Sequence, residues 1–357
     1  MINYLAHWEQ ILIQSRSSIV SELNEYKFNA ICPIENNSEL ENMYHNLTHW
    51  ELDRTKLLDI KGIIRLRKIL KNTGKNSTFH IFTLKSGFIF MISSIFINRN
   101  FKSTLSITGL GFLFSKTLKS NLLKYLSKII FMFFINKTFE NIIFQNETDK
   151  NIFLKYSKFK NNALIIESSG LKIDEFKPKT TINKNLKILF AGRLLYDKGI
   201  VEYIDFANLC NEENLEFYLA GDFDFGNPKA ISKFDFEKMI KNSNIEFLGH
   251  ISSSNSLKDY DVLISLSEHE GFSRILLEAA YVGLYCIAKE NNGTKFLSQF
   301  ENTSLLDSTD PKLIKKEINK VEEGFKFISD KNKKIISEKF TIEYVASQFQ
   351  KIYNWII

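Results

Sequence analysis

The chain has 357 residues, 44% hydrophobic and 25% charged, which suits two globular domains and excludes a disordered chain. Its three cysteines lie far apart and form no CxxC pair, which excludes a disulfide framework and a zinc ribbon and fits a reducing cytoplasm. The formal net charge of +6 does not indicate nucleic acid as a partner, because no recognition helix, RNP motif or zinc finger accompanies it.

The sequence predicts neither secretion nor a membrane-spanning helix. Its first residues lack the basic flank, long apolar stretch and small-residue cleavage site of a signal peptide. The most apolar runs are Phe88–Ile97 and Ile129–Ile135. Both are much shorter than the roughly 20 residues that a membrane-spanning helix requires, so we expect them to be buried helices or strands.

Strands and helices are predicted to alternate through the first half, which is typical of a parallel sheet flanked by helices. The predicted strands are short apolar or β-branched runs at residues 3–6, 28–34, 77–84, 103–108 and 141–146. A helical pattern of apolar residues covers Ile63–Leu70. The segment Gly170–Asn185 is polar, contains a proline and has no apolar period. We therefore predict a first domain at residues 1–170 and a linker at residues 171–185.

The first half is also strongly basic between Arg54 and Glu140. Only Asp59 and Glu140 oppose the basic side chains of this region, which are Arg54, Lys56, Lys61, Arg65, Arg67, Lys68, Lys71, Lys75, Lys85, Arg99, Lys102, Lys116, Lys119, Lys124, Lys128 and Lys137. One interpretation is a solvated basic face in a lysine-rich protein. The other is attraction to anionic lipid headgroups or a lipid diphosphate, which predicts a peripheral protein on the inner face of the plasma membrane.

A second alternating series follows and predicts a second domain at residues 186–340. Its strands are expected at residues 186–192, 215–221, 245–249, 261–267 and 284–289, with helices near residues 199–210, 236–241 and 273–281. The final segment Thr341–Ile357 has apolar residues at helical spacing and predicts an amphipathic helix. The fold class is therefore α/β, with two parallel-sheet domains.

The segment Ser265–Gly283 predicts a strand, an acidic turn and the start of a helix. Backbone amides at such a helix start can bind a phosphate or polar ligand without a metal. Glu270 and Glu278 would lie about 12 Å apart if the whole segment were helical. The two carboxylates could then accept hydrogen bonds from hydroxyls at both ends of an elongated ligand. The alternative is an acidic helix that faces solvent.

A second motif, Leu189–Ile200, favours the ligand interpretation. Here a predicted strand carries Gly192 and Arg193 to the carboxyl edge of the sheet, and Lys198 opens the next helix. Open α/β sheets bind ligands at that edge. Arg193 can pair with a diphosphate by parallel hydrogen bonds, and Lys198 can act on it as a point charge. The two motifs together predict a diphosphate site.

At these motifs the sequence resembles the retaining glycosyltransferases of the large family 4. The resemblance rests on AGRLLYDKG, YLAGD, FLGH, EGFSRILLEAA and NNGTKF in the second half, and more loosely on HIFTLKSG, SITGLGFLF, IIFQNETD and ESSGLKIDEF in the first. It implies the GT-B fold of two Rossmann-like domains, with the first binding the acceptor and the final helix crossing back to that domain. TLKSG and ITGLG resemble members that build capsular polysaccharide, O-antigen or other glycan repeat units on a polyprenyl diphosphate.

The resemblance also implies roles for matching residues. Arg193 and Lys198 would hold the donor diphosphate, with UDP as the usual nucleotide, and Glu278 would bind the ribose hydroxyls. Glu270, with the amides of Phe272 and Ser273, would hold the transferred sugar. The leaving phosphate would take the acceptor proton, so neither a cofactor nor a side-chain nucleophile is expected. Ser273 stands where relatives usually have glycine.

On the acceptor side the motifs are weaker. His80 ends a predicted strand beside TLKSG and is our first candidate for a catalytic contact with substrate; His7, directly after the first strand, is the second. Thr108 stands where many relatives carry histidine, so Thr108 and Gly109 are possible acceptor-side residues.

Other interpretations remain open. Asp222 and Asp224 form a DxD, the spacing by which other glycosyltransferases hold a divalent cation, although the basic residues already supply positive charge and no metal is expected. The dinucleotide fingerprint GxGxxG is absent. A nucleotide-sugar epimerase of the same architecture is one alternative, and a non-catalytic sugar-nucleotide-binding protein is another.

Overall fold

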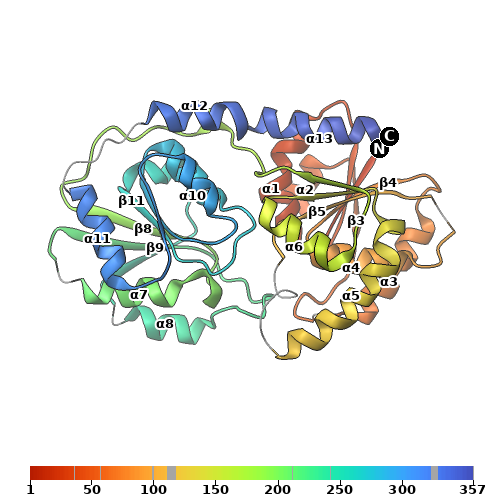
Figure 1. Cartoon of the computed structure of the whole chain (residues 1–357), viewed down its shortest axis with the longest axis horizontal. Helices are drawn as coiled ribbons and strands as arrows, with labels where there is room; N and C mark the ends of the chain where they lie inside the picture. The colour runs from red at the N-terminus through yellow and green to blue at the C-terminus, as the bar shows by residue number, and fades with distance from the viewer. Residues whose placement is uncertain are drawn as a thin grey trace. The chain divides into compact units, whose positions relative to one another are not determined.

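The computed structural model describes residues 1–35, 37–56, 58–98, 100–110, 118–210, 212–241, 243–322 and 329–356 (Figure 1). Residues 111–114 of the SITGLGFLF segment, together with Arg99 and Lys116 of the basic region, lie outside these ranges. The chain divides into two compact units. The first comprises Met1–Gly170 and Ile342–Ile357, and the second comprises Leu171–Thr341.

The first unit is built on a parallel sheet of the order β3-β2-β1-β4-β5-β6-β7. Each strand predicted in this half is present, and β3 and β7 are added at one edge each. The strands are β1 (Ile2–Ala6), β2 (Phe28–Cys32), β3 (Asn46–His49), β4 (Thr78–Phe82), β5 (Lys102–Ile107), β6 (Asn141–Phe144) and β7 (Asn162–Ile165). Central strands β1 and β4 are buried along their whole length, because helices cover both faces of the sheet.

Two helical layers cover this sheet (Figure 1). On one face, α1 (Glu9–Glu22), α2 (Asn37–Met43) and α13 (Ile342–Ile356) share a hydrophobic cluster with β1 and β2. On the other face, a second cluster joins the sheet to α3 (Ile60–Asn72), α4 (Leu84–Ser94), α5 (Leu118–Thr138) and α6 (Glu147–Ser157). The final helix therefore packs beside the first strand, where the hydroxyls of Tyr4 and Tyr353 lie 2.7 Å apart.

The second unit repeats the architecture with a parallel sheet of the order β10-β9-β8-β11-β12-β13. Its strands are β8 (Leu186–Ala191), β9 (Leu215–Ala220), β10 (Ile245–Gly249), β11 (Val262–Ser265), β12 (Tyr285–Lys289) and β13 (Thr303–Leu306). The first five confirm the predicted strands. The two parallel sheets confirm the predicted α/β class.

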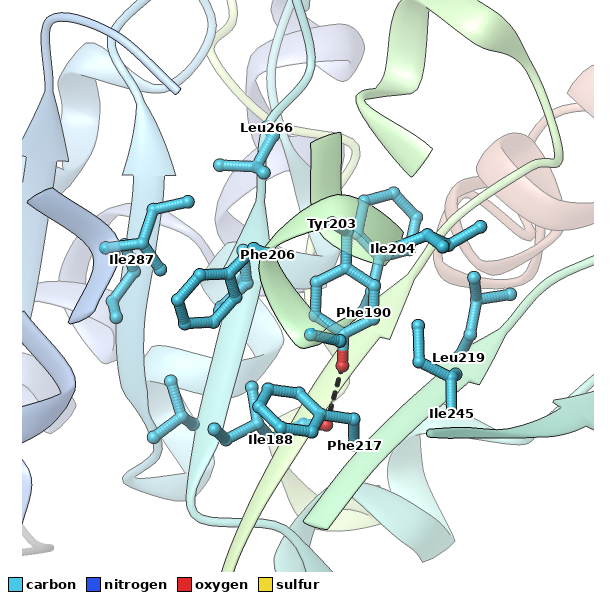
Figure 2. Packing of buried hydrophobic residues seen from close by; sticks show 14 of the residues in the cluster. Ile188, Phe190, Tyr203, Ile204, Phe206, Phe217, Leu219, Ile245, Leu266 and Ile287 are labelled. Atoms are coloured by element: carbon cyan, nitrogen blue, oxygen red, sulfur yellow. Dashed lines mark hydrogen bonds between the residues drawn. The ribbon is translucent and has the colours of Figure 1, made fainter. Parts of the chain in front are cut away.

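One face of the second sheet packs against α7 (Ile200–Leu209), α8 (Lys233–Lys241) and α11 (Pro311–Glu322), and the other against α10 (Arg274–Val282) and α12 (Asp330–Lys339). Figure 2 shows the first of these cores, in which Phe190, Tyr203 and Phe217 pack together. The Tyr203 hydroxyl donates to the backbone oxygen of Ile188 at 2.9 Å. This bond satisfies the polar end of a fully buried ring and anchors α7 to β8.

The segment expected as a linker, residues 171–185, belongs to the second unit. Leu171 and Phe176 are buried in the cluster of α10 and α12. The Lys179 amine pairs at 3.1 Å with the carboxylate of Asp261, and both side chains are buried. Its polar composition thus serves an ion pair formed with a residue about 80 positions away, which no local pattern can reveal.

The expectation that Ile129–Ile135 is buried was wrong for three of its seven residues. It lies on α5, where Phe131 and Ile135 are buried but Ile129, Met132 and Phe133 are exposed, Phe133 at 68%. The apolar run is continuous, so a helix necessarily turns some of it away from the core. Within the described ranges, no helix is both long and apolar enough to cross a membrane.

Candidate functional site

The two motifs of the second unit meet where β8 and β11 lie side by side. β8 and β11 pair in parallel, from Val262 opposite Ile188 to Ile264 opposite Phe190. The chain leaves β8 for α7 on one face of the sheet and β11 for α10 on the other. Neighbouring connections here diverge to opposite faces of the sheet, and such a place is called the switch point of the sheet. Open α/β sheets bind ligands at their switch points.

Lys198 and Glu270 join the two motifs directly. The Lys198 Nζ and a Glu270 carboxylate oxygen are 2.5 Å apart, and both side chains are about four-fifths buried. Gly199 brings Lys198 to this place, because it has φ +80 and a Cβ there would lie 2.5 Å from the backbone oxygen of Leu266. Only glycine fits such a backbone and such an approach. The structure therefore brings together two residues that the sequence placed in separate motifs.

Arg193 follows β8 and turns toward the loop after β9. Its Nη1 lies 2.8 Å from a carboxylate oxygen of Asp224, which is buried, whereas the Arg193 side chain is 41% exposed. Asp222, the other half of the DxD, accepts from the ring of His250 at 2.6 Å on the surface. The two carboxylates of the DxD therefore serve different partners. Asp224 as the partner of Arg193 was not predicted.

The turn between Glu270 and α10 is held by the NNGTKF segment. The Ser273 amide donates to the backbone oxygen of Gly293 at 3.1 Å. A Cβ on Gly293 would lie 2.5 Å from the Glu270 backbone oxygen, so the two loops are in tight contact. The Phe272 ring stacks on Phe296 with centroids 4.2 Å apart. The prediction that the Ser273 amide binds the sugar needs correction, because this amide already has a protein acceptor.

Glu278 lies on α10, which begins only at Arg274. Glu270 therefore precedes the helix, and the 12 Å estimate for one continuous helix does not apply. The Glu278 side chain is 5% exposed and accepts from Arg274 Nε at 2.7 Å. This burial contradicts the alternative of an acidic helix that faces solvent. Charged groups are rarely buried unless an interaction offsets the free energy of their desolvation.

In the first unit, His80 does not lie at the end of its strand, where a contact with substrate was predicted. Its side chain is fully buried in the middle of β4. Nδ1 lies 2.6 Å from the Tyr353 hydroxyl of α13, and Nε2 lies 2.7 Å from the Ser106 hydroxyl of β5. Burial, with a smaller contribution from the Arg16 charge, lowers the pKa of His80 well below its usual value. With both ring nitrogens bonded inside the core, His80 has no route to substrate and instead joins the final helix to the sheet.

Thr108 and Gly109 do follow a strand, β5, at the carboxyl edge of the first sheet. Thr108 lines a cavity of about 10 Å³ together with Arg16 and Gln145, which is room for about one water molecule. Gly109 has φ +136, a conformation that favours glycine. Their acceptor-side role stays a prediction.

Comparison with known proteins agrees with these features. Residues 172–338 match the family model for glycosyl transferases group 1. The capsular polysaccharide biosynthesis glycosyltransferase CapM of Staphylococcus aureus is 23% identical over 316 residues, 83% of this chain and 81% of that protein. The UDP-Gal:alpha-D-GlcNAc-diphosphoundecaprenol alpha-1,3-galactosyltransferase of Escherichia coli is 28% identical over 262 residues, 68% of this chain and 65% of that protein.

Solved structures share the fold along the whole chain. The sucrose-phosphate synthase of Thermosynechococcus elongatus aligns over 100% of this chain and 99% of its own, with a TM-score of 0.79 and 14% identity. Anabaena Alr3699/HepE in complex with UDP aligns over 99% of both chains, with a TM-score of 0.72 and 15% identity. Residues 172–338 therefore belong to the glycosyl transferases group 1 family, in a chain that has the GT-B fold.

Proposed function

We propose that this chain is a retaining glycosyltransferase that moves a sugar from UDP onto a lipid-linked or surface glycan acceptor. One observation carries the proposal: Lys198 and Glu270 meet at the switch point of the second sheet, with Arg193 at the same edge. Cations beside a carboxylate suit two of the three parts of a sugar nucleotide, the diphosphate and the sugar with its hydroxyls.

In this proposal the ion pair rearranges when the donor binds. Lys198 turns from Glu270 to the phosphate oxygens, and Arg193 joins it there. Glu270 is then free to accept hydrogen bonds from sugar hydroxyls. Negative charge grows on the diphosphate as the bond between the anomeric carbon and the phosphate oxygen breaks. The two cations therefore stabilise the transition state more than the bound donor.

The same proposal needs no side-chain nucleophile. The acceptor oxygen bonds to the anomeric carbon on the face from which the diphosphate leaves, and the acceptor proton passes to the leaving phosphate oxygen. Configuration is then retained, and the protein contributes positioning and charge stabilisation. Glu278, buried in the middle of α10, would accept from the ribose hydroxyls of the nucleotide.

The donor and acceptor classes are supported by the similar proteins. The E. coli relative is named for UDP-Gal and for an acceptor on diphosphoundecaprenol, and the S. aureus relative for capsular polysaccharide. The HepE structure contains UDP. We therefore propose UDP as the nucleotide and a polyprenyl-diphosphate-linked glycan as the acceptor.

The test is a panel of UDP- and GDP-sugars, measured by protection against thermal unfolding and then by turnover with a prenyl-diphosphate-linked glycan. A ligand at a hundred times its dissociation constant should add about 2.7 kcal/mol to the free energy of unfolding. We expect protection by UDP-sugars and transfer with retention. Conversion of the donor to its epimer without any acceptor, or binding with no turnover on any acceptor, would contradict the proposal.

We also propose that turnover does not require a metal ion, because Arg193 and Lys198 supply the positive charge. Activity should then survive EDTA. Loss of activity on chelation, restored by manganese, would contradict this and point to Asp222 and Asp224. Such a result would require both carboxylates to leave their present partners, His250 and Arg193.

The last part of the proposal is peripheral binding to an anionic membrane through α5. This helix carries no acidic residue and four lysines, Lys119, Lys124, Lys128 and Lys137. Tyr125, Ile129, Met132 and Phe133 are exposed at spacings that place them on one side of it. A basic helix with an exposed apolar side is suited to lie in the interface of a bilayer.

Sedimentation with phosphatidylglycerol vesicles tests this surface. We expect binding at low salt that weakens as salt screens the lysines, and loss of binding in Phe133→Asp. The control is Ile152→Asp on α6, which is also exposed but belongs to another helix. No binding at low salt, or equal loss in both variants, would contradict the role of α5.

A further inference from the structure

The loop after β12 is a tight turn built around the side chain of Asn291. Its Oδ1 accepts from the Gly293 backbone amide at 2.9 Å, and its own backbone amide donates to the Thr294 hydroxyl at 2.9 Å. The Thr294 hydroxyl donates in turn to the backbone oxygen of Lys289, the last residue of β12, at 2.9 Å. Thr294 is fully buried. Asparagine favours such a turn, because its side chain can bond to the backbone two residues further on.

The other end of the Asn291 side chain reaches the loop after β11. Its Nδ2 donates to the backbone oxygen of Ser267 at 2.9 Å. The Gly293 amide needs an oxygen as its partner, and the Ser267 carbonyl needs a nitrogen, so the two bonds together fix the orientation of the side-chain amide. β11 and β12 are parallel neighbours, with Ser265 opposite Ala288, which brings both loops to the same edge of the sheet. Asn291 therefore joins two loops of the donor side directly.

The loop that carries Glu270 is attached to this turn at both ends. At its start, Asn291 bonds the Ser267 carbonyl, and at its end the Ser273 amide donates to the backbone oxygen of Gly293 at 3.1 Å. Between these two points, the backbone of Glu270 lies against Gly293 so closely that a Cβ there would be 2.5 Å away. The attachment at the start depends on a side chain. A substitution can therefore remove it and leave the backbone bond at the other end in place.

The same loop is bonded on its other side to the loop that carries Lys198. The Glu268 amide donates to the backbone oxygen of Asp197 at 3.0 Å. The contact of 2.5 Å between Lys198 Nζ and the Glu270 carboxylate thus depends on two loops and on the bonds that hold them. Loops hold functional groups less precisely than helices or strands, and a displacement of about 1 Å can lower a rate by about a hundredfold. The position of Glu270 is therefore sensitive to what fixes its loop.

We propose that Asn291 is a positioning residue of this site, whose side-chain amide holds the loop from Ser267 to Ser273 so that the Glu270 carboxylate faces the transferred sugar. This inference rests on the proposed function, because it names a further residue on which the same reaction depends. Asn291 contacts neither the diphosphate nor the sugar. It acts through Glu270, so its loss affects the reaction of the sugar more than the binding of the nucleotide.

The experiment compares Asn291→Ala with the unmodified chain in the turnover assay and in calorimetric titration with UDP. Turnover at saturating UDP-sugar should fall about tenfold or more, as expected for the loss of a hydrogen bond and a shift of the carboxylate. Affinity for UDP, which lacks the transferred sugar, should stay within a few-fold. The control is Asn255→Ala, an exposed asparagine of the same unit. Equal losses of turnover and UDP affinity would show that Asn291 supports the whole edge of the sheet, and would overturn the proposal.

A second variant, Asn291→Ser, separates the turn from the bond between the loops. A serine hydroxyl can accept from the Gly293 amide, as serine does in turns, but it lacks the amide nitrogen that reaches the Ser267 carbonyl. Turnover should fall as it does in Asn291→Ala, with a melting temperature closer to that of the unmodified chain. Recovery of turnover in Asn291→Ser would show that the turn alone matters, and the proposal would fail.

A double substitution tests whether Asn291 acts through Glu270. If it does, Asn291→Ala should lower turnover much less in the Glu270→Gln background than in the unmodified chain. Equal fold losses in the two backgrounds would show that the residues act independently, and would overturn the proposal. If the unmodified chain transfers sugar and Asn291→Ala matches its turnover, only this inference fails. No transfer by the unmodified chain would count against the proposed function itself.

Discussion

At the switch points of the two sheets, different kinds of interaction close the edge of the sheet. In the second unit, the edge of the sheet is closed by ion pairs, Lys198 with Glu270 and Arg193 with Asp224. In the first unit, it is closed by hydrogen bonds among His7, Thr83 and Ser86, and the neighbouring Lys85 amine donates to backbone oxygens. A paired cation must leave its carboxylate before it binds a phosphate, whereas the Lys85 amine donates to carbonyl oxygens, which carry only partial charges.

This difference has consequences for each side. A largely buried ion pair gains little net stability, because its attraction is offset by desolvation, but removal of one partner leaves an isolated charge. The second-unit edge is therefore predicted to respond strongly and specifically to single substitutions. The first-unit edge should respond less strongly, because His7, Thr83 and Ser86 are joined there by hydrogen bonds and not by ion pairs. The predictions below test that contrast.

The largest effect is expected for Glu270→Gln. Turnover should fall by about a hundredfold, because the charged hydrogen bond to the sugar matters most as charge shifts in the transition state. UDP affinity should stay within a few-fold or rise, because Lys198 loses the carboxylate that competes with phosphate. Turnover and calorimetry measure the two quantities. The control is Glu268→Gln, an exposed carboxylate two residues away, and full activity in Glu270→Gln would contradict the assignment.

Lys198→Met is expected to weaken UDP binding by about ten- to a hundredfold, since it removes a charged contact to the diphosphate and leaves Glu270 without its partner. Uridine has no phosphate, so its binding should change much less. Calorimetry with both ligands measures the difference, and the exposed Lys184→Met is the control. If both ligands lose affinity equally, Lys198 acts on the fold of the site and not on the diphosphate.

Glu278→Gln should weaken UDP binding about tenfold, because the buried carboxylate loses the charge that accepts from the ribose. The sharper comparison uses 2′-deoxy-UDP, which lacks one ribose hydroxyl. The substitution should cost less affinity for this ligand than for UDP. Equal losses for the two nucleotides would show that Glu278 supports α10 through Arg274 and does not contact the ribose.

The contrast between the units also explains what the sequence could predict. The second-unit motifs are contiguous, because each strand end, glycine and helix start lies within about a dozen residues of the next. Arg193, Lys198 and Glu270 were selected in that way. Their pairing could not be found, because it depends on which strands are neighbours, and β8 and β11 are about 70 residues apart.

The first unit shows the reverse case. His80 was selected because it lies beside TLKSG, but along β4 successive side chains alternate between faces, and position 80 points into the core against α13. His7 lies at the edge with Thr83, although 76 residues separate them. A rule that takes the first residue after each strand would have favoured His7. It still requires the order β1-β4, which no single segment of the sequence encodes.

The smallest effect concerns stability, and it tests whether His80 is purely structural. The folded state lowers the pKa of His80 well below its usual 6.5, because burial disfavours the charged ring. Between the two values the unfolded chain binds a proton that the folded chain does not. The contribution of His80 to stability is therefore fully present above pH of about 6.5 and declines as the pH falls from there toward the lower folded-state pKa.

His80→Gln should remove this part of the pH dependence while it lowers stability at every pH, because glutamine cannot satisfy both the Tyr353 and Ser106 hydroxyls with the same geometry. Denaturant titrations from pH 5 to 8 give the free energy of unfolding, and the exposed His45→Gln controls for loss of one imidazole. At neutral pH, turnover per folded molecule should stay unchanged. A large loss of turnover in a folded His80→Gln protein would show that His80 takes part in the reaction. It would then follow that α13 opens far enough to expose His80.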